Sequence, residues 1–106
     1  MGSSKLCTLH CRANAPLLTP GELSLMHSEV GSWQVDERGR LAKAFPLPNF
    51  ADALALANRI GVVAEAEDHH PELTVAWGSL RVVTWTHSAG GLSANDFILA
   101  ARIDEL

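Results

Sequence analysis

Residues 65–96 read EAEDHHPELTVAWGSLRVVTWTHSAGGLSAND and contain the end of one predicted helix, a predicted hairpin and the start of another helix. The first helix is expected to end near Asp68, because Pro71 disfavours helical geometry at His70. Two runs rich in β-branched residues, 73–77 and 80–87, flank a turn near Gly78 and predict a β-hairpin. Ser93 then opens the last helix. The stretch therefore predicts the order helix, strand, strand, helix.

The upstream half of the chain predicts the same order. Thr19, Pro20 and Glu22 have the positions of an N-cap and first turn, so a helix is expected from there to about Val30. Two strands follow over residues 33–35 and 40–47, separated by a turn at 36–39. Asn49 begins a long helix with apolar residues at helical spacing. The order α-β-β-α-β-β-α predicts an α+β fold, with a four-stranded antiparallel sheet and three helices on one face.

Length and composition exclude several classes of protein. A chain of 106 residues, 47% hydrophobic and 19% charged, fits one soluble globular domain. A net charge of −4 and eight scattered Lys and Arg residues argue against a nucleic-acid-binding surface. No run reaches the roughly 18 apolar residues of a membrane span. We therefore expect a cytoplasmic protein that binds neither nucleic acid nor membrane.

The N-terminal residues differ in character from the rest. Residues 1–16 are expected to form a flexible leader, and residues 17–106 the folded domain. Cys7, His10 and Cys11 form a C-x-x-H-C pattern that could supply part of a metal site. Structural zinc needs four ligands, however, and no second pair stands at a recognisable spacing. Two reduced thiols are therefore expected.

Three of the five histidines lie in residues 65–96 beside several carboxylates. Imidazole titrates near neutral pH, so histidines beside carboxylates suit acid–base chemistry. Glu65 and His69 are four residues apart, and a hydrogen bond between them is expected if the helix persists. His87 is expected to end a strand beside a flexible glycine pair, at a sheet margin where sites are often built. The alternatives are a polar helix end for His69 and His70, and a surface histidine for His87.

Asp96 has both a structural and a functional interpretation. Ser93 and Asp96 have the spacing of a capping box, with Ser93 at the N-cap and Asp96 at the third helical position. Asp96 also precedes Leu99 and Ala100 on the apolar stripe of the helix. We expect it to cap the helix and to face a pocket.

A metal site built from the same histidines and carboxylates is disfavoured by spacing. The ligand types suit zinc or iron, but no H-x-x-x-H pattern occurs. Adjacent side chains also diverge by roughly 100° on a helix and face opposite ways on a strand. No metal ligand is therefore assigned.

The three tryptophans, Trp33, Trp77 and Trp85, are expected to be core or interface aromatics. Stacking of Trp33 on a flat heterocycle is the alternative. A sheet covered on one face leaves its other face or an edge exposed, and Val83 and Trp85 are candidates for that surface. We therefore expect a homo-oligomer, a dimer or tetramer formed through strand edges or outer helices.

Three motifs resemble those of the pterin-4a-carbinolamine dehydratases. They are E-x-x-x-H-H-P at 65–71, T-H-x-x-G-G-L-S-x-x-D at 86–96 and L-A-x-x-I-D at 99–104. The resemblance extends from about Leu17 to Leu106. It implies the same sheet and helices, assembly as dimers or tetramers, and no metal or redox cofactor.

The resemblance also implies a reaction and a set of residues. The reaction is loss of water from 4a-hydroxytetrahydropterin to give quinonoid dihydropterin, which recycles the pterin cofactor of aromatic amino-acid hydroxylases. A non-catalytic dimerisation or assembly module for a partner protein is the alternative. The resemblance does not say which histidine is the acid and which the base. The implied catalytic residues are His69, His70 and His87, the supporting acids Glu65 and Asp96, and the substrate-binding residues Pro71, Thr86, Ser88 and Ala89.

Overall fold

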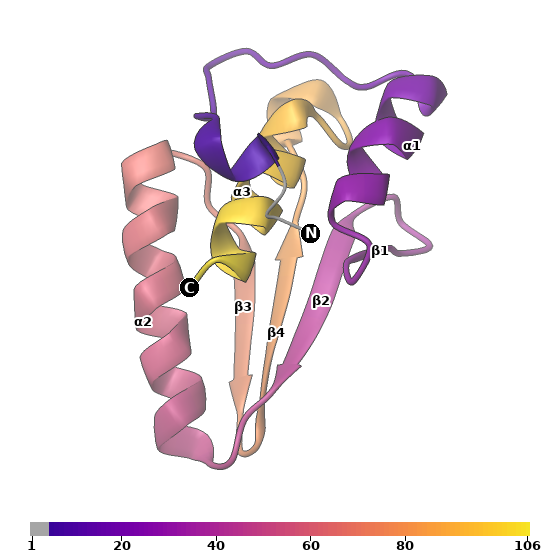
Figure 1. Cartoon of the computed structure of the whole chain (residues 1–106). Coiled ribbons are helices and arrows are strands. Elements are labelled where there is room, and N and C mark those ends of the chain that lie inside the picture. Colours follow the sequence, from indigo (N-terminus) through magenta and orange to yellow (C-terminus); the bar gives the residue numbers. More distant parts are fainter. Residues whose placement is uncertain (1–4) are drawn as a thin grey trace.

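The computed structural model describes residues 5–106 and confirms the predicted α+β fold (Figure 1). The helices are α1 (Pro20–Glu29), α2 (Phe50–Glu67) and α3 (Ala94–Asp104). The strands are β1 (Gln34–Val35), β2 (Leu41–Pro46), β3 (Glu72–Ala76) and β4 (Ser79–Thr84). Two short 3-10 helices are η1 (Lys5–Thr8) and η2 (His87–Ala89). All strand pairs are antiparallel, in the order β1-β2-β4-β3. Helix α3 lies over the sheet, flanked by α1 and α2 (Figure 1).

The three helices begin where the capping residues predict. Thr19 and Glu22 form a capping box at α1, and Ser93 and Asp96 form another at α3. At α2, the side chain of Asn49 accepts the backbone N–H of Asp52 at 2.7 Å. These caps satisfy first-turn amides that would otherwise lack partners.

The core lies between the sheet and the helices. On the central strand β4, Leu80 and Val82 are fully buried while Arg81 is exposed, as the two-residue period of a strand requires. Phe97 and Leu99 of α3 are also fully buried. Val83, which sequence placed on an exposed surface, is instead only 3% exposed, between Ala42 of β2 and Glu72 of β3.

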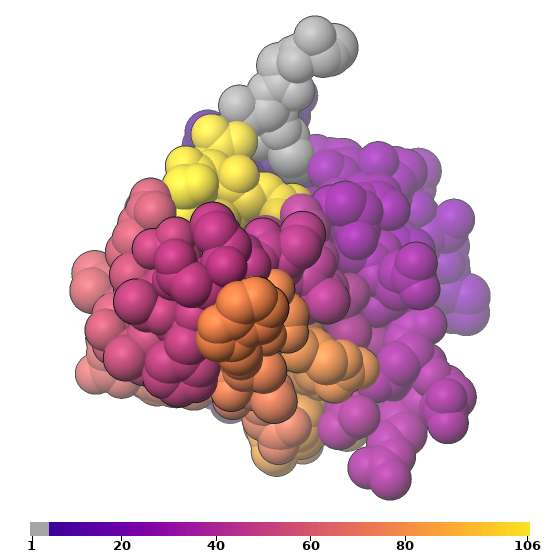
Figure 2. All heavy atoms as spheres, turned by 90° about the horizontal axis from the view of Figure 1, so that it is seen from below, coloured from indigo at the N-terminus to yellow at the C-terminus, as the bar shows by residue number. Residues whose placement is uncertain are grey.

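The tryptophans divide between core and surface. Trp33 is fully buried and donates its indole N–H to the carboxylate of Asp104 at 3.0 Å, which confirms the core interpretation and leaves no face for stacking on a ligand. Trp85 is half-buried beneath the guanidinium of Arg40. Trp77 is 76% exposed in the β3–β4 turn. Figure 2 shows this turn, in orange, against the start of α2, in magenta.

Strand β4 ends three residues earlier than predicted. The sequence predicts a strand to His87, but β4 stops at Thr84 and His87 begins η2. The carbonyl of Thr86 accepts the N–H groups of residues 89, 90 and 91, and Gly90 adopts a left-handed conformation with φ 75°. The Thr86 carbonyl therefore forms its hydrogen bonds within this tight turn, and does not continue the strand pairing of β4.

The leader differs from the expectation of a flexible segment over the residues that the structure describes. Leu6 is 5% exposed and belongs to the hydrophobic core, and η1 packs against α3. The backbone N–H of Cys11 donates to the Glu67 carboxylate at 2.7 Å. Burial of apolar surface and these polar contacts outweigh the chain entropy lost on ordering. Residues 1–4 of the expected leader lie outside the described residues.

No helix within residues 5–106 has the length and apolar character needed to cross a bilayer.

Candidate active site

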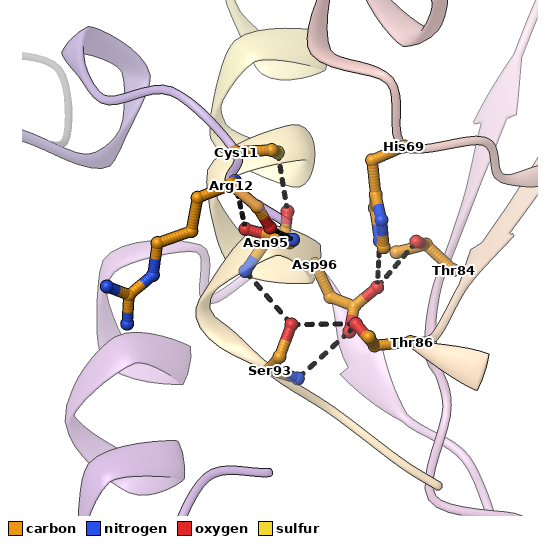
Figure 3. A network of polar contacts seen from close by, with 8 residues as sticks. All are labelled: Cys11, Arg12, His69, Thr84, Thr86, Ser93, Asn95 and Asp96. Carbon is orange, nitrogen blue, oxygen red and sulfur yellow. Dashed lines mark hydrogen bonds and ion pairs between the residues drawn. The ribbon is translucent and has the colours of Figure 1, made fainter. Parts of the chain in front are cut away.

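The site is organised around the carboxylate of Asp96, which is fully buried in the first turn of α3. Its Oδ1 accepts the hydroxyl of Thr84 at 2.7 Å and a ring nitrogen of His69 at 2.7 Å. Its Oδ2 accepts the backbone N–H of Ser93 at 3.0 Å and the hydroxyl of Thr86 at 2.8 Å. Figure 3 shows these contacts converging on the carboxylate. Asp96 therefore caps the helix and holds a histidine at the same time.

The end of α2 brings His69 to this carboxylate. Asp68 ends the helix in a left-handed conformation with φ 51°, and the chain turns there toward α3. The side chain of His69 is 11% exposed, and its Nε2 faces Asp96. Because a carboxylate only accepts hydrogen bonds, Nε2 carries the proton in this contact. The second ring nitrogen, Nδ1, takes no part in it.

The prediction of a hydrogen bond between Glu65 and His69 is wrong. Glu65 instead accepts Nε2 of His70 at 2.6 Å. The left-handed turn at Asp68 explains why Glu65 binds His70 and not His69. It moves His69 away from the helix face and directs His70 back toward the last turn of α2. The His70 and Glu65 side chains are 54% and 79% exposed, so this pair is solvated whereas the His69–Asp96 pair is not.

His87 is exposed at the margin of the sheet, as sequence predicts, although in a 3-10 helix rather than a strand. Its ring lies 4.5 Å from that of Trp85, centroid to centroid, at an interplanar angle of 31°. These two rings line a hollow of about 360 Å³. The other lining residues are Arg38, Gly39, Arg40, Gly90 and Gly91.

The remaining predicted residues are neighbours of His70 and His87 in the sequence. Thr86 is buried, and its hydroxyl points inward to Asp96 and Ser93 (Figure 3). Pro71 and Ala89 are half-buried, and Ser88 is exposed. Thr86 thus supports the buried carboxylate directly and connects through the backbone to His87.

Sequence reasoning missed two supporting residues, Glu67 and Asn95. Asn95 exchanges hydrogen bonds with the backbone of Arg12, accepting at 3.0 Å and donating at 2.8 Å. Glu67, with a side chain only 5% exposed, accepts the N–H of Cys11 and contacts His10 and Arg102. A buried position for Glu67 follows from the helical spacing of Ile60, Ala64 and Glu67, but its partners are distant in sequence.

Within the described part of the chain, no cluster of three or more His, Cys, Asp or Glu side chains could hold a metal ion.

Comparison with known proteins places this arrangement in one family. The family model described as pterin 4 alpha carbinolamine dehydratase matches residues 16–106. Two similar proteins, each named "Putative pterin-4-alpha-carbinolamine dehydratase", come from Rickettsia canadensis and Chlorobium limicola. The first is 45% identical over 96% of this chain and 94% of the relative. The second is 48% identical over 91% of this chain and 87% of the relative.

A solved structure supports the same grouping. The crystal structure of a transcriptional coactivator/pterin dehydratase from Brucella melitensis is 29% identical to this chain and superposes with a TM-score of 0.77. The match covers 83% of this chain and 95% of the other.

Proposed function

The chain belongs to the pterin 4 alpha carbinolamine dehydratase family, and from this premise we propose that it is a hydro-lyase that removes water from 4a-hydroxytetrahydropterin. The product is the quinonoid dihydropterin, and the physiological role is recycling of the pterin cofactor of an aromatic amino-acid hydroxylase. The observation that carries the proposal is the His69–Asp96 pair, a histidine oriented by a buried carboxylate at the sheet margin that also bears His87.

The reaction needs one acid and one base. The bond between C4a and its hydroxyl oxygen breaks as that oxygen takes up a proton and leaves as water. The N5–H bond breaks as a base takes the proton, and its electron pair forms the new N5–C4a double bond. The acid loses one proton and the base gains one, so the proton count of the enzyme is unchanged, and proton exchange with solvent restores both groups for the next turnover. Histidines suit both steps at neutral pH.

The geometry supports His69, His70 and His87 as the proton-transfer residues. His69 and His70 each bind a carboxylate through Nε2, which leaves Nδ1 of each ring for the substrate. Asp96 and Glu65 fix the orientation of these rings. His87 lies exposed beside the hollow, where the flat Trp85 ring and the glycines of residues 90–91 leave room for a planar ligand. Pro71, Ser88 and Ala89 are the proposed edge of the substrate site.

The test is substitution of His87. His87→Ala should lower turnover by on the order of 100-fold or more, the usual scale for a general acid or base. His87→Gln, which cannot cycle a proton, should be nearly as impaired while still binding a pterin analogue. Thermal stability should change little in both variants, because the His87 side chain is exposed. Rates must be compared with the uncatalysed dehydration, on protein treated with chelator.

Two results would contradict the proposal. Near-normal turnover in both variants would remove His87 from the proton transfers and leave them to His69 and His70. A parent protein with no rate above the uncatalysed reaction would refute the dehydratase function and favour a dimerisation or assembly module.

A further inference from the structure

Residues 9–12 of the leader cross from the last turn of α2 to the first turn of α3, and we name them the clamp. In Figure 3 the clamp passes the start of α3 at Cys11 and Arg12, beside Asn95. The two helix ends that it joins are those that carry the candidate active-site pair. Glu67 lies two residues before His69, and Asn95 immediately precedes Asp96.

Two consecutive backbone amides of the clamp hold the two helices. The N–H of Cys11 donates to Glu67 Oε1 at 2.7 Å, and the N–H of Arg12 donates to Asn95 Oδ1 at 3.0 Å. The Asn95 side-chain amide returns a bond to the carbonyl of Arg12 at 2.8 Å. Because the two amides belong to consecutive residues, their acceptors on α2 and α3 must lie close to each other.

The clamp is itself anchored along its length. The guanidinium of Arg102 donates to the carbonyl of Leu9, and its Nε lies 3.6 Å from Glu67 Oε2. The same Glu67 oxygen is 2.9 Å from Nδ1 of His10. The Cys11 thiol donates to the carbonyl of Asn95 at 3.4 Å. The clamp therefore contacts both helices through several groups.

Hydrogen bonds continue from Asn95 to the buried carboxylate. The backbone N–H of Asn95 donates to Ser93 Oγ at 3.2 Å. Thr86 gives its single hydroxyl proton to Asp96, so the Ser93 hydroxyl must be the donor in its 2.7 Å contact with Thr86. One directional chain thus runs from Asn95 through Ser93 and Thr86 to Asp96 (Figure 3).

We propose that the clamp sets the distance and orientation of the His69–Asp96 pair, and that Glu67 and Asn95 are positioning residues for the dehydration. This inference rests on the proposed function for its kinetic consequence only. The His69–Asp96 contact itself is a structural property that can be measured without turnover. A displacement of about 1 Å at a catalytic group can cost on the order of 100-fold in rate.

The test uses full-length variants that release one anchor each. Asn95→Ala and Glu67→Ala should lower kcat by at least about tenfold with little change in KM, because the effect is on orientation rather than on substrate contacts. Both should weaken or abolish the downfield NMR resonance of the His69 imidazole N–H that binds Asp96. Glu67→Gln keeps an oxygen to accept the Cys11 N–H, and should recover most of the lost kcat and the resonance.

Asn49→Ala is the matched control, since it also removes a side-chain oxygen that accepts a backbone N–H, but at the opposite end of α2. It should lower thermal stability while preserving kcat and the His69 resonance. Parental kcat and an unchanged resonance in both alanine variants would overturn the proposal, as would an equal loss in Asn49→Ala. If the parent lacks dehydratase activity, the proposed function fails, and the resonance alone decides whether the clamp orients His69.

Discussion

At the scale of single residues, Asp96 shows how one side chain serves folding and chemistry together. Its Oδ2 completes the capping box with Ser93, which stabilises the start of α3. Its Oδ1 holds His69. With Thr84 and Thr86 as further donors, each oxygen accepts two hydrogen bonds, so the carboxylate is fully satisfied although completely buried. Orientation of His69 is thus tied to the stability of the helix.

Asp96→Asn should be strongly destabilising for this reason. An Asn side chain has one acceptor oxygen, so its amide group would face two of the four donors that now reach the carboxylate. Leaving buried donors unpaired should cost roughly 2–4 kcal/mol of unfolding free energy. Urea denaturation measures this cost, with the exposed Asp52→Asn as a control. A loss below about 0.5 kcal/mol, the range of surface substitutions, would contradict the network.

Cys11 should be chemically inert in the folded protein. Burial raises the pKa of the Cys11 thiol to about 12, and the charges of Glu67 and Asp96 add to the effect. Because the thiolate is the reactive form, alkylation by iodoacetamide at pH 8.5 should be on the order of 100-fold or more slower than that of a small free thiol. Peptide mass spectrometry measures the rate at Cys11, and unfolding in urea should restore it. Rapid alkylation of Cys11 in the native protein would show that the clamp is open.

At the scale of elements, the C-terminal end of α2 concentrates three functions in four residues. Glu67 binds the clamp, Asp68 ends the helix in a left-handed conformation, and His69 and His70 diverge to two different carboxylates. A regular helix through residue 70 would have placed both histidines on successive helical positions, about 100° apart. The early turn is what gives His69 a buried partner.

The contacts of Glu67 predict a stability term that depends on pH. Burial raises the pKa of Glu67, but the Cys11 N–H, His10 and Arg102 lower it by more, so the net pKa lies below the ordinary value. A carboxyl with a depressed folded pKa stabilises the protein above its ordinary pKa, and loses that contribution as the pH falls through the folded pKa. Glu67→Gln should therefore be less stable than the parent at pH 7, and the difference should shrink below about pH 4.5, the ordinary value.

Thermal unfolding of parent and variant between pH 3 and pH 7 measures this difference. Glu37→Gln, a charge removal in the exposed β1–β2 turn, is the matched control. A parent-to-variant difference that stays constant over this range would show that the Glu67 contacts do not depend on its charge.

At the scale of the whole molecule, α2 exposes several large apolar side chains. Phe50, Leu54 and Val62 are 48%, 46% and 72% exposed. Exposed apolar side chains gathered on one element often mark a surface of interaction. This surface of α2, rather than the buried Val83, is the better candidate for the predicted contact between copies.

We therefore predict a dimer or tetramer assembled through α2. Light scattering at micromolar concentration should give two or four times the 11.4 kDa chain mass. Val62→Lys should lower the mass toward that of one chain, because it places a charge in the apolar contact. Leu25→Lys, an equivalent change at a 73% exposed position of α1, should leave the mass unchanged. A parent protein of single-chain mass, or dissociation by Leu25→Lys alone, would contradict the prediction.

The elements and their order can be predicted from sequence alone, because the signals for them are local. The capping residues Thr19, Asn49 and Ser93 mark the three helix starts, and Pro71 and Gly78 bound the second hairpin. Hydrogen bonds between a cap and its first turn involve residues two or three positions apart, so they can be recognised without knowing the fold. The full set of candidate site residues came instead from the resemblance of three sequence motifs to those of a known family.

The hydrogen-bond partners of the site residues, by contrast, depend on how the whole chain folds. Glu65 is closer in sequence to His69 than to His70, yet it binds His70, because the left-handed turn at Asp68 exchanges the two rings. Cys11 reaches Glu67 across 56 residues, and this contact depends on how η1 packs against α3. Such contacts form when distant segments bury apolar surface together, and no local pattern encodes them. Leu6 and Cys11, which the sequence analysis assigned to a flexible leader, make such contacts with the rest of the fold.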